Sequence, residues 1–101
     1  MLQVKLVPVC KIICEDSMIE YGDLMLTEAA YMIIAADGLA KPLIVRRAGS
    51  QYQLIDGTFW YQAAKVAKDL EPMRCEMVSA IVVEDAKMEA KIMAQVALSR
   101  I

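Results

Sequence analysis

The strongest candidate for a chemical site in this sequence is the segment Asp56-Gly57-Thr58. An apolar stretch precedes them and a stretch with helical spacing follows, so Gly57 is expected at a tight turn between a strand and a helix. Such a turn gathers several backbone N–H groups, and the helix dipole adds partial positive charge. The sequence therefore predicts a phosphate-sized anion site at Gly57 and Thr58.

Three nearby side chains could assist this turn. Arg46 and Lys65 are cations of the predicted strand and helix that flank it, and cations of this kind pair with phosphate oxygens. Asp56 could place a metal ion beside a bound nucleotide, although we predict no dedicated metal site and no resident cofactor. Thr58 also suits a structural task, and we expect it to serve as the helix N-cap.

Three consecutive aromatic residues follow the turn, namely Phe59, Trp60 and Tyr61. On a helix their side chains point about 100° apart, so all three cannot enter one core. Phe59 matches the apolar stripe of the helix, whereas Trp60 is expected at its margin and Tyr61 in solvent. Aromatic rings at these positions can pack within the fold, anchor a protein contact or stack on a ligand ring. Trp60 and Tyr61 are therefore candidate interaction residues.

The cysteines offer a second chemistry. Cys10, Cys14 and Cys75 are accompanied by no histidine anywhere in the sequence, which removes the usual base of a catalytic thiol and a common zinc ligand. We expect three reduced, buried thiols that pack as small apolar residues. A small thiol-redox protein that uses one of them is the weakest of the functional hypotheses.

Composition limits the class of protein. A chain of 101 residues has room for one domain, residues 1–101, and its 58% hydrophobic content argues against disorder. No uninterrupted apolar run reaches the roughly 18 residues of a membrane span, and the N-terminus lacks the pattern of a secretory leader. The sequence therefore predicts a cytoplasmic protein without membrane contact.

The charge pattern bears on nucleic acids. The net charge is −2, and Arg46-Arg47 is the only adjacent basic pair. Non-specific DNA binding depends on clustered cations that neutralise several phosphates. Direct DNA binding by this chain alone is therefore not expected.

The apolar periodicity predicts the element order β-α-β-β-α-β-α. A first strand is interrupted by Pro8, the first helix begins at an N-cap Thr27 and ends at Gly38, and the last helix begins near Glu84 or Asp85 and ends near Ser99. The remaining predicted elements are strands at 43–47, 51–55 and 73–78 and a helix at 58–70. That helix has a predicted inward stripe of Phe59, Ala63, Val66 and Leu70.

Two of these helices are unusually apolar. Residues 29–36 carry almost no polar group, and the last helix has two apolar seams. The seams comprise Ala86, Ala90, Met93 and Ala97, and Met88, Ile92 and Val96. A core of this size can hardly cover both, so part of this surface is expected to meet another chain, a protein partner or a second copy. The alternative is that both seams fill one wide core face.

Three segments together resemble the N-terminal domain family of the ParB partition proteins, which includes the sulfiredoxin branch. They are 38–46, with a Gly-Leu step, Pro42 and a strand ending in Arg46; 52–57, a strand ending in Asp-Gly; and Ala63-Ala64-Lys65 with Ala67. The likeness covers about residues 27–97. It implies a small α+β domain with a mixed sheet and packed helices.

The same resemblance implies a ligand site at the start of the second helix. Family members hold nucleotide phosphates there with an acid and three arginines, and the sulfiredoxin branch has a cysteine and an arginine. This sequence has Thr58, Phe59, Trp60 and Gln62 at the matching positions. Because the arginine fork grips a triphosphate, we predict at most weak nucleotide binding.

Two main functional hypotheses follow. The first is a non-catalytic ParB-like binding module that engages a protein partner or itself in plasmid or chromosome partition or a related regulatory system. The second is a nucleotide-binding or nuclease-type enzyme with a weakened phosphate site formed by Gly57, Thr58, Arg46 and Lys65. The missing arginines favour the first.

Overall fold

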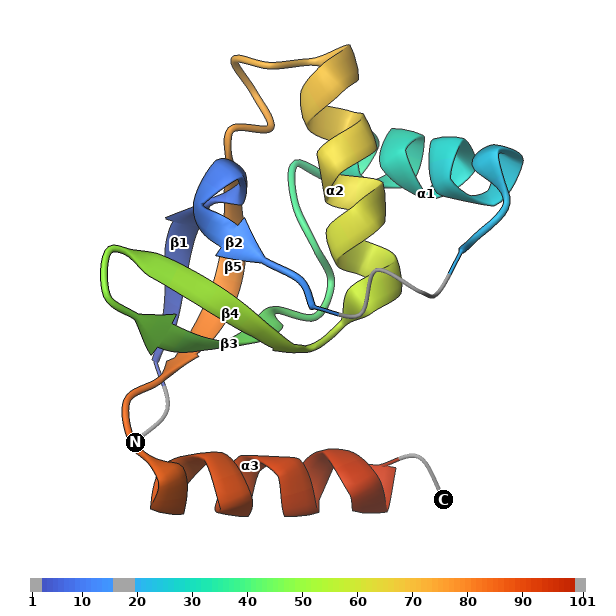
Figure 1. The fold of residues 1–101 in the computed structure, drawn as a ribbon. Coiled ribbons are helices and arrows are strands. Elements are labelled where there is room, and N and C mark those ends of the chain that lie inside the picture. The colour runs from blue at the N-terminus through green and yellow to red at the C-terminus, as the bar shows by residue number, and fades with distance from the viewer. Residues whose placement is uncertain (1–2, 16–19, 100–101) are drawn as a thin grey trace.

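The computed structural model describes residues 3–15 and 20–99, which form a five-stranded sheet with three α-helices (Figure 1). In chain order the elements are β1 (Val4–Pro8), the 3-10 helix η1 (Val9–Lys11), β2 (Ile12–Ile13), α1 (Asp23–Ala36), β3 (Leu43–Ala48), β4 (Gln51–Asp56), α2 (Thr58–Leu70), β5 (Met77–Val83) and α3 (Ala86–Ser99). The predicted α+β class and the predicted order of helices and strands are confirmed, with β2 and η1 added. Among these described residues, no helix is both long and apolar enough to cross a bilayer.

The sheet is mixed, with strand order β1-β5-β3-β4-β2. β5 pairs antiparallel with β1 and parallel with β3, while β4 pairs antiparallel with β3 and parallel with β2. The short turn between β3 and β4 makes a hairpin, whereas β5 reaches its place beside β3 only after the chain has passed through α2. This topology places β3 at the centre, next to the turn that begins α2.

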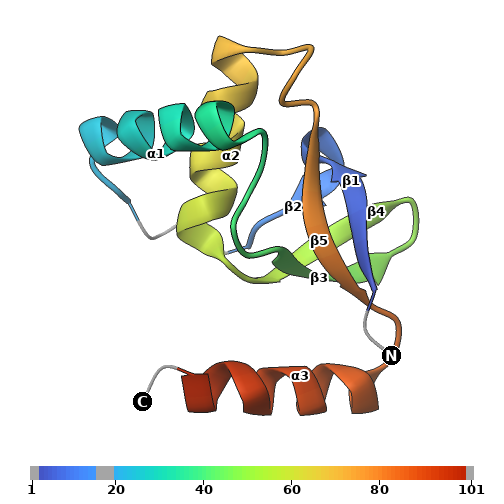
Figure 2. The same ribbon diagram turned by 180° about the vertical axis from the view of Figure 1, so that it is seen from behind.

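The two faces of the sheet are covered unequally. α1 and α2 pack on one face and α3 lies against the other (Figures 1 and 2). The larger core joins the sheet to α1, α2 and η1, and its fully buried members include Leu43, Val45, Ala63, Ala67 and Ala80. The smaller core holds Ile44, Val83 and Ile92. Strand alternation explains the division, because Leu43 and Val45 face α2 while Ile44 faces α3.

Pro8 has a larger effect than the break that the sequence predicts. β1 ends at Pro8, η1 follows, and β2 then pairs at the opposite edge of the sheet from β1. Proline lacks the N–H that a ladder needs, so it is tolerated at the end of this edge strand. The segment read as one interrupted strand therefore supplies both outer strands of the sheet.

The N-cap of α1 lies five residues earlier than predicted, so the prediction of Thr27 as its N-cap is wrong. Gly22 occupies the N-cap, and Thr27 Oγ1 donates a hydrogen bond to the Asp23 carbonyl inside the helix, at 2.8 Å. At the other end, Asp37 adopts the left-handed conformation (φ 57°) and Gly38 N donates to the Ile33 carbonyl at 3.0 Å. The predicted stop of the helix at Gly38 is thus confirmed, because Gly38 directly follows the C-cap residue Asp37.

The last predicted strand was placed too early. β5 runs from Met77 to Val83 rather than over 73–78, because the residues before it form a turn in which Cys75 N donates to the Glu71 carbonyl at 2.9 Å. The last helix begins where expected, since Asp85 Oδ1 accepts a hydrogen bond from Met88 N at 2.8 Å in the manner of an N-cap.

The two apolar seams of α3 have different surroundings. Ile92 is buried, and Met88 and Val96 are half-buried against the sheet. In the other seam Ala86, Ala90 and Ala97 are exposed, and Met93 is half-buried. The expectation that this domain cannot cover both seams is confirmed, because most of the second seam is exposed, and the reading of both seams as one core face is wrong.

The three alanines on the inner face of α2 allow it to lie close to the sheet. Ala67 is 0% exposed, so Ala67→Leu must insert three extra carbon atoms into a filled space. We expect a loss of about 1–3 kcal/mol in the free energy of unfolding, measured by urea denaturation. The control Asp69→Leu changes an exposed position of the same helix and should leave stability nearly unchanged. Equal losses in the two variants would contradict this packing account.

Candidate functional site

Gly57 forms the turn that the sequence predicts between β4 and α2. Its backbone is left-handed, with φ 102° and ψ 32°, and its carbonyl accepts the first helical hydrogen bond from Tyr61 N at 2.8 Å. A Cβ atom at this position would lie 2.7 Å from Leu43 Cδ2. Glycine is therefore required twice, for the conformation and for the close approach to β3.

Thr58 is the first residue of α2, and Gly57 occupies the N-cap without a side-chain capping bond. The prediction that Thr58 caps the helix is therefore wrong. The backbone N–H groups of the first helical turn remain the anion-attracting feature of this site, as for any helix start.

A groove of about 350 Å³ opens beside the turn. Gly57 and Trp60 line it together with Lys41, Asp56 and residues of β5 and α3. Trp60 is 39% exposed, which confirms its predicted place at the margin of the helix. Lys41 is a cation that the sequence reasoning missed. The sequence feature that pointed to Lys41 was its position just before Pro42, at the start of the strand that packs on Gly57.

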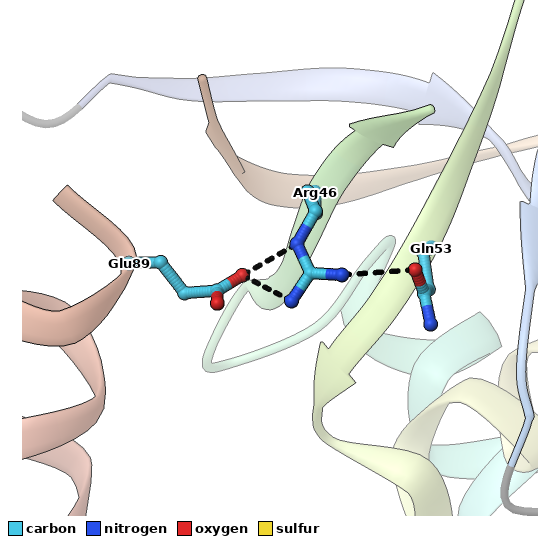
Figure 3. Close-up of polar contacts among 3 residues, drawn as sticks. All are labelled: Arg46, Gln53 and Glu89. Carbon is cyan, nitrogen blue, oxygen red and sulfur yellow. Dashed lines mark hydrogen bonds and ion pairs between the residues drawn. The ribbon is translucent and has the colours of Figure 1, made fainter. Parts of the chain in front are cut away.

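Arg46 lies away from this groove and is already engaged. Its Nε and Nη2 contact Glu89 Oε1 at 2.7 and 2.6 Å, and its Nη1 donates to Gln53 Oε1 at 3.0 Å (Figure 3). Glu89 belongs to α3 and Gln53 to β4, so the guanidinium joins three elements on the α3 side of the sheet. Arg46 therefore links α3 to the sheet, and it does not line the groove beside Gly57.

Lys65 lies on another surface again. Its ammonium is 5.5 Å from the centre of the Tyr61 ring, and it lines a groove of about 640 Å³ whose wall includes the acids Glu20, Asp23 and Asp69. Thr58 lines a third groove, with Gln53, Leu54 and Ile55. The structure thus does not bring Gly57, Thr58, Arg46 and Lys65 to one pocket.

The prediction that Tyr61 faces solvent is wrong. Tyr61 is 7% exposed, and its hydroxyl donates to the Ile12 carbonyl of β2 at 3.0 Å. Burial, the largest cause, raises the pKa of Tyr61 above its usual value near 10. The Tyr61 side chain therefore ties α2 to an edge strand and is not available to a partner.

The buried face of α2 is accordingly rotated from the predicted stripe. It comprises Tyr61, Ala63, Ala64 and Ala67, while Phe59 and Val66 are half-buried and Leu70 is 45% exposed. The Phe59 ring makes edge contacts with Tyr21 and Trp60, at centroid distances of 5.1 and 5.3 Å. The spacing of Tyr61, Ala64 and Ala67 is also typical of one face of a helix, but the stripe predicted from Phe59, Val66 and Leu70 indicated a different face.

All three cysteines are free thiols. Cys10 is exposed, so the prediction of three buried thiols is wrong for it, while Cys14 and Cys75 are half-buried. Burial is the largest cause that raises the pKa of Cys75, which lowers its thiolate fraction and its reactivity. Over residues 3–15 and 20–99, His, Cys, Asp and Glu form no cluster suited to a metal ion.

No family model matches the sequence, and no curated protein matches it. Solved structures do. The C-terminally truncated ParB of Caulobacter crescentus complexed with CTP-γ-S superposes with a TM-score of 0.64 and 18% identity, over 94% of this chain and 53% of that one. Sulfiredoxin of Arabidopsis thaliana gives a TM-score of 0.66 and 16% identity, over 88% and 93%.

The chain has the ParB/sulfiredoxin-like fold. A third similar structure is SbnI of Staphylococcus aureus with a C-terminal truncation, with a TM-score of 0.58 and 28% identity over 81% of this chain. This chain spans about a third of that SbnI chain (31%) and about half of the ParB chain (53%).

Within this fold, Thr58, Phe59 and Trp60 form the first residues of α2, the segment to which the family resemblance assigns phosphate binding. That these positions have lost the family's arginines stays a prediction from the sequence.

The contact between Gly57 and Leu43 can be separated from the cost of a left-handed backbone. Gly57→Ala introduces both, whereas Gly49→Ala, at φ 64° with open space around it, introduces only the second. We expect Gly49→Ala to cost about 1 kcal/mol and Gly57→Ala to cost roughly 1–3 kcal/mol more. Urea denaturation measures both losses, and equal values would show that the approach to β3 is not a constraint.

Tyr61 should give the domain an alkaline sensitivity. Because its pKa is raised in the folded state, its contribution is complete below pH 10 and declines as the pH rises toward the folded pKa. Tyr61→Phe should cost about 1 kcal/mol near neutral pH, through the lost hydrogen bond, and should reduce this decline. The control Tyr31→Phe, at an exposed site, should match the wild type. Thermal unfolding at pH 7 to 11 measures both effects, and an unaltered alkaline decline in Tyr61→Phe would contradict the account.

Proposed function

We propose that this chain is a non-catalytic ParB-like binding module that acts through contact with a protein partner or a second copy of itself. The observation that carries the proposal is the position of Arg46. Its guanidinium is paired with Glu89 at 2.6 Å and does not line the Gly57 groove, so its charge is already engaged by an acid. The residues that line the Gly57 groove include one cation, Lys41, and one acid, Asp56.

The distribution of apolar side chains supports contact with another protein. On α1, Leu24, Met25, Tyr31 and Met32 are 58–73% exposed, and on α3 Leu98 is 69% exposed. Contiguous exposed apolar surface on a small domain commonly marks an interaction site. Trp60, at the mouth of the Gly57 groove, adds an accessible aromatic ring of the kind that anchors protein contacts. Tyr61 has no part in this surface, because it is buried.

The setting we propose is plasmid or chromosome partition, or a related regulatory system, in the cytoplasm. The proposal draws on the similarity to the Caulobacter chromosome-partitioning protein ParB, whose structures include complexes with CTP-γ-S and with the centromeric parS site. Direct DNA contact by this chain alone is not part of the proposal, because its net charge is −2 and its described arginines are ion-paired with acids.

The second candidate is a weak nucleotide binder or nuclease-type enzyme. It is favoured by the shape of the Gly57 turn, which begins a helix beside an open groove lined by Lys41 and Trp60. The backbone N–H groups could hold a phosphate, and Trp60 could stack on a base. Without an arginine guanidinium to bind the phosphate oxygens in a bidentate way, such binding would be weak.

Nucleotide binding separates the two candidates. We expect CTP or ATP with Mg²⁺ to leave the thermal unfolding midpoint of the wild-type chain unchanged at millimolar concentration, because a ligand stabilises only in proportion to its binding. Trp60→Arg places a cation at the groove beside Gly57 and should produce a measurable rise in the midpoint with the same nucleotides. A clear rise in the wild type would favour the nucleotide-binding enzyme instead.

A further inference from the structure

The outer face of α1 is built from large apolar side chains around one acid. Leu24, Glu28 and Met32 follow one another at intervals of four residues, so they form a row on the helix, and all three are exposed. Met25 and Tyr31 flank the row and are each 58% exposed. The sequence has no Lys or Arg between Ile12 and Ala40, so no base of this segment offsets Glu28.

The outer face of α3 has the opposite character. Lys87 and Lys91 lie one turn apart and are exposed, and beside them runs a row of small residues that ends in Leu98. The small residues are Ala86, Ala90, Ala94 and Ala97.

The acids of α3 do not offset these lysines on the outer face. Glu89 is turned toward the sheet and paired with Arg46 (Figure 3). The acids that precede the helix are also engaged, since Glu84 contacts Arg47 at 3.2 Å and Asp85 accepts the capping hydrogen bond. The outer face of α3 therefore presents positive charge on a shallow, alanine-rich surface.

These two faces are complementary, but one copy cannot bring them together. α1 packs into the larger core on one side of the sheet and α3 into the smaller core on the other (Figures 1 and 2). Bulky side chains of α1 match the shallow alanine row of α3, and Glu28 matches Lys87 and Lys91 in charge. Pairing α1 with α1 would instead bring two Glu28 carboxylates together at the centre of an apolar contact.

We propose that α3 of a second copy docks on the outer face of α1, with Glu28 paired to Lys87 or Lys91. The inference rests on the proposed function and names its partner as this same chain. Because the two faces differ, the contact is head-to-tail, and repeated copies extend a chain or close a ring. A single helix-on-helix contact is smaller than the roughly 800 Å² per partner of a standard interface, so association should be weak and concentration-dependent.

Charge exchange at the proposed contact provides the test. Sedimentation velocity at about 0.05 to 1 mM and low salt should show a rising average mass for the wild type, reduced by added salt. Glu28→Lys alone, and Lys87→Glu with Lys91→Glu, should each sediment as monomers, because each variant then faces itself with like charge. An equimolar mixture of the two variants should associate again, since each face meets an opposite charge on the other variant. Glu76→Lys, the same change outside both helices, should associate like the wild type.

Each outcome of the sedimentation experiment either supports or overturns the proposed contact between α1 and α3. A wild type that stays monomeric to 1 mM overturns the proposal, and so do charge variants that associate as the wild type does, or a mixture that stays monomeric. Circular dichroism and thermal unfolding check that the variants remain folded, as their exposed positions lead us to expect. Failure here leaves the binding-module proposal intact with another partner, whereas nucleotide binding by the wild type contradicts that proposal independently.

Discussion

The close contact between Gly57 and Leu43 is the constraint on which the arrangement of α2 depends. Gly57 has no Cβ atom, so the start of the helix can lie directly against β3 at the centre of the sheet. From this start, Ala63, Ala64 and Ala67 keep the helix close to the sheet along its length. The same orientation buries Tyr61 and brings its hydroxyl to the Ile12 carbonyl, which fixes β2 at the far edge. One small residue thus positions a helix and, through it, an edge strand.

The pairing of Arg46 connects the architecture to the function. Arg46 contacts both Glu89 and Gln53, so its guanidinium is used to hold α3 against the sheet. A guanidinium engaged in this way does not offer a free positive charge to a phosphate at the Gly57 turn, whose groove it does not line. The contact with Arg46 also turns Glu89 of α3 toward the sheet, so the outer face of α3 presents alanines and lysines.

The fold alone leaves the activity open. ParB/sulfiredoxin-like structures include a chromosome-partitioning protein complexed with CTP-γ-S and a sulfiredoxin, and both superpose on most of this chain at less than 20% identity. A shared fold supports different functions through different sites. Here the predicted phosphate-site residues do not line one common groove, while α1 exposes four large apolar side chains, and this contrast is why we favour a binding module.

The local pattern of the sequence determined the order of helices and strands, the bounds of α2, the Gly57 turn and the break at Pro8, because each depends on neighbours in the chain. It could not determine that Tyr61 is buried, since a buried tyrosine hydroxyl usually needs a hydrogen-bond acceptor, and here that acceptor is the carbonyl of Ile12, 49 residues away. It likewise offered Arg46 as a phosphate ligand, but only the tertiary structure set Glu89, 43 residues away, beside it. Helical spacing revealed two apolar seams in α3, and packing decided which one meets the sheet. Contacts between residues far apart in sequence decided these points, because the partner that satisfies a polar or apolar group is known only once the chain has folded.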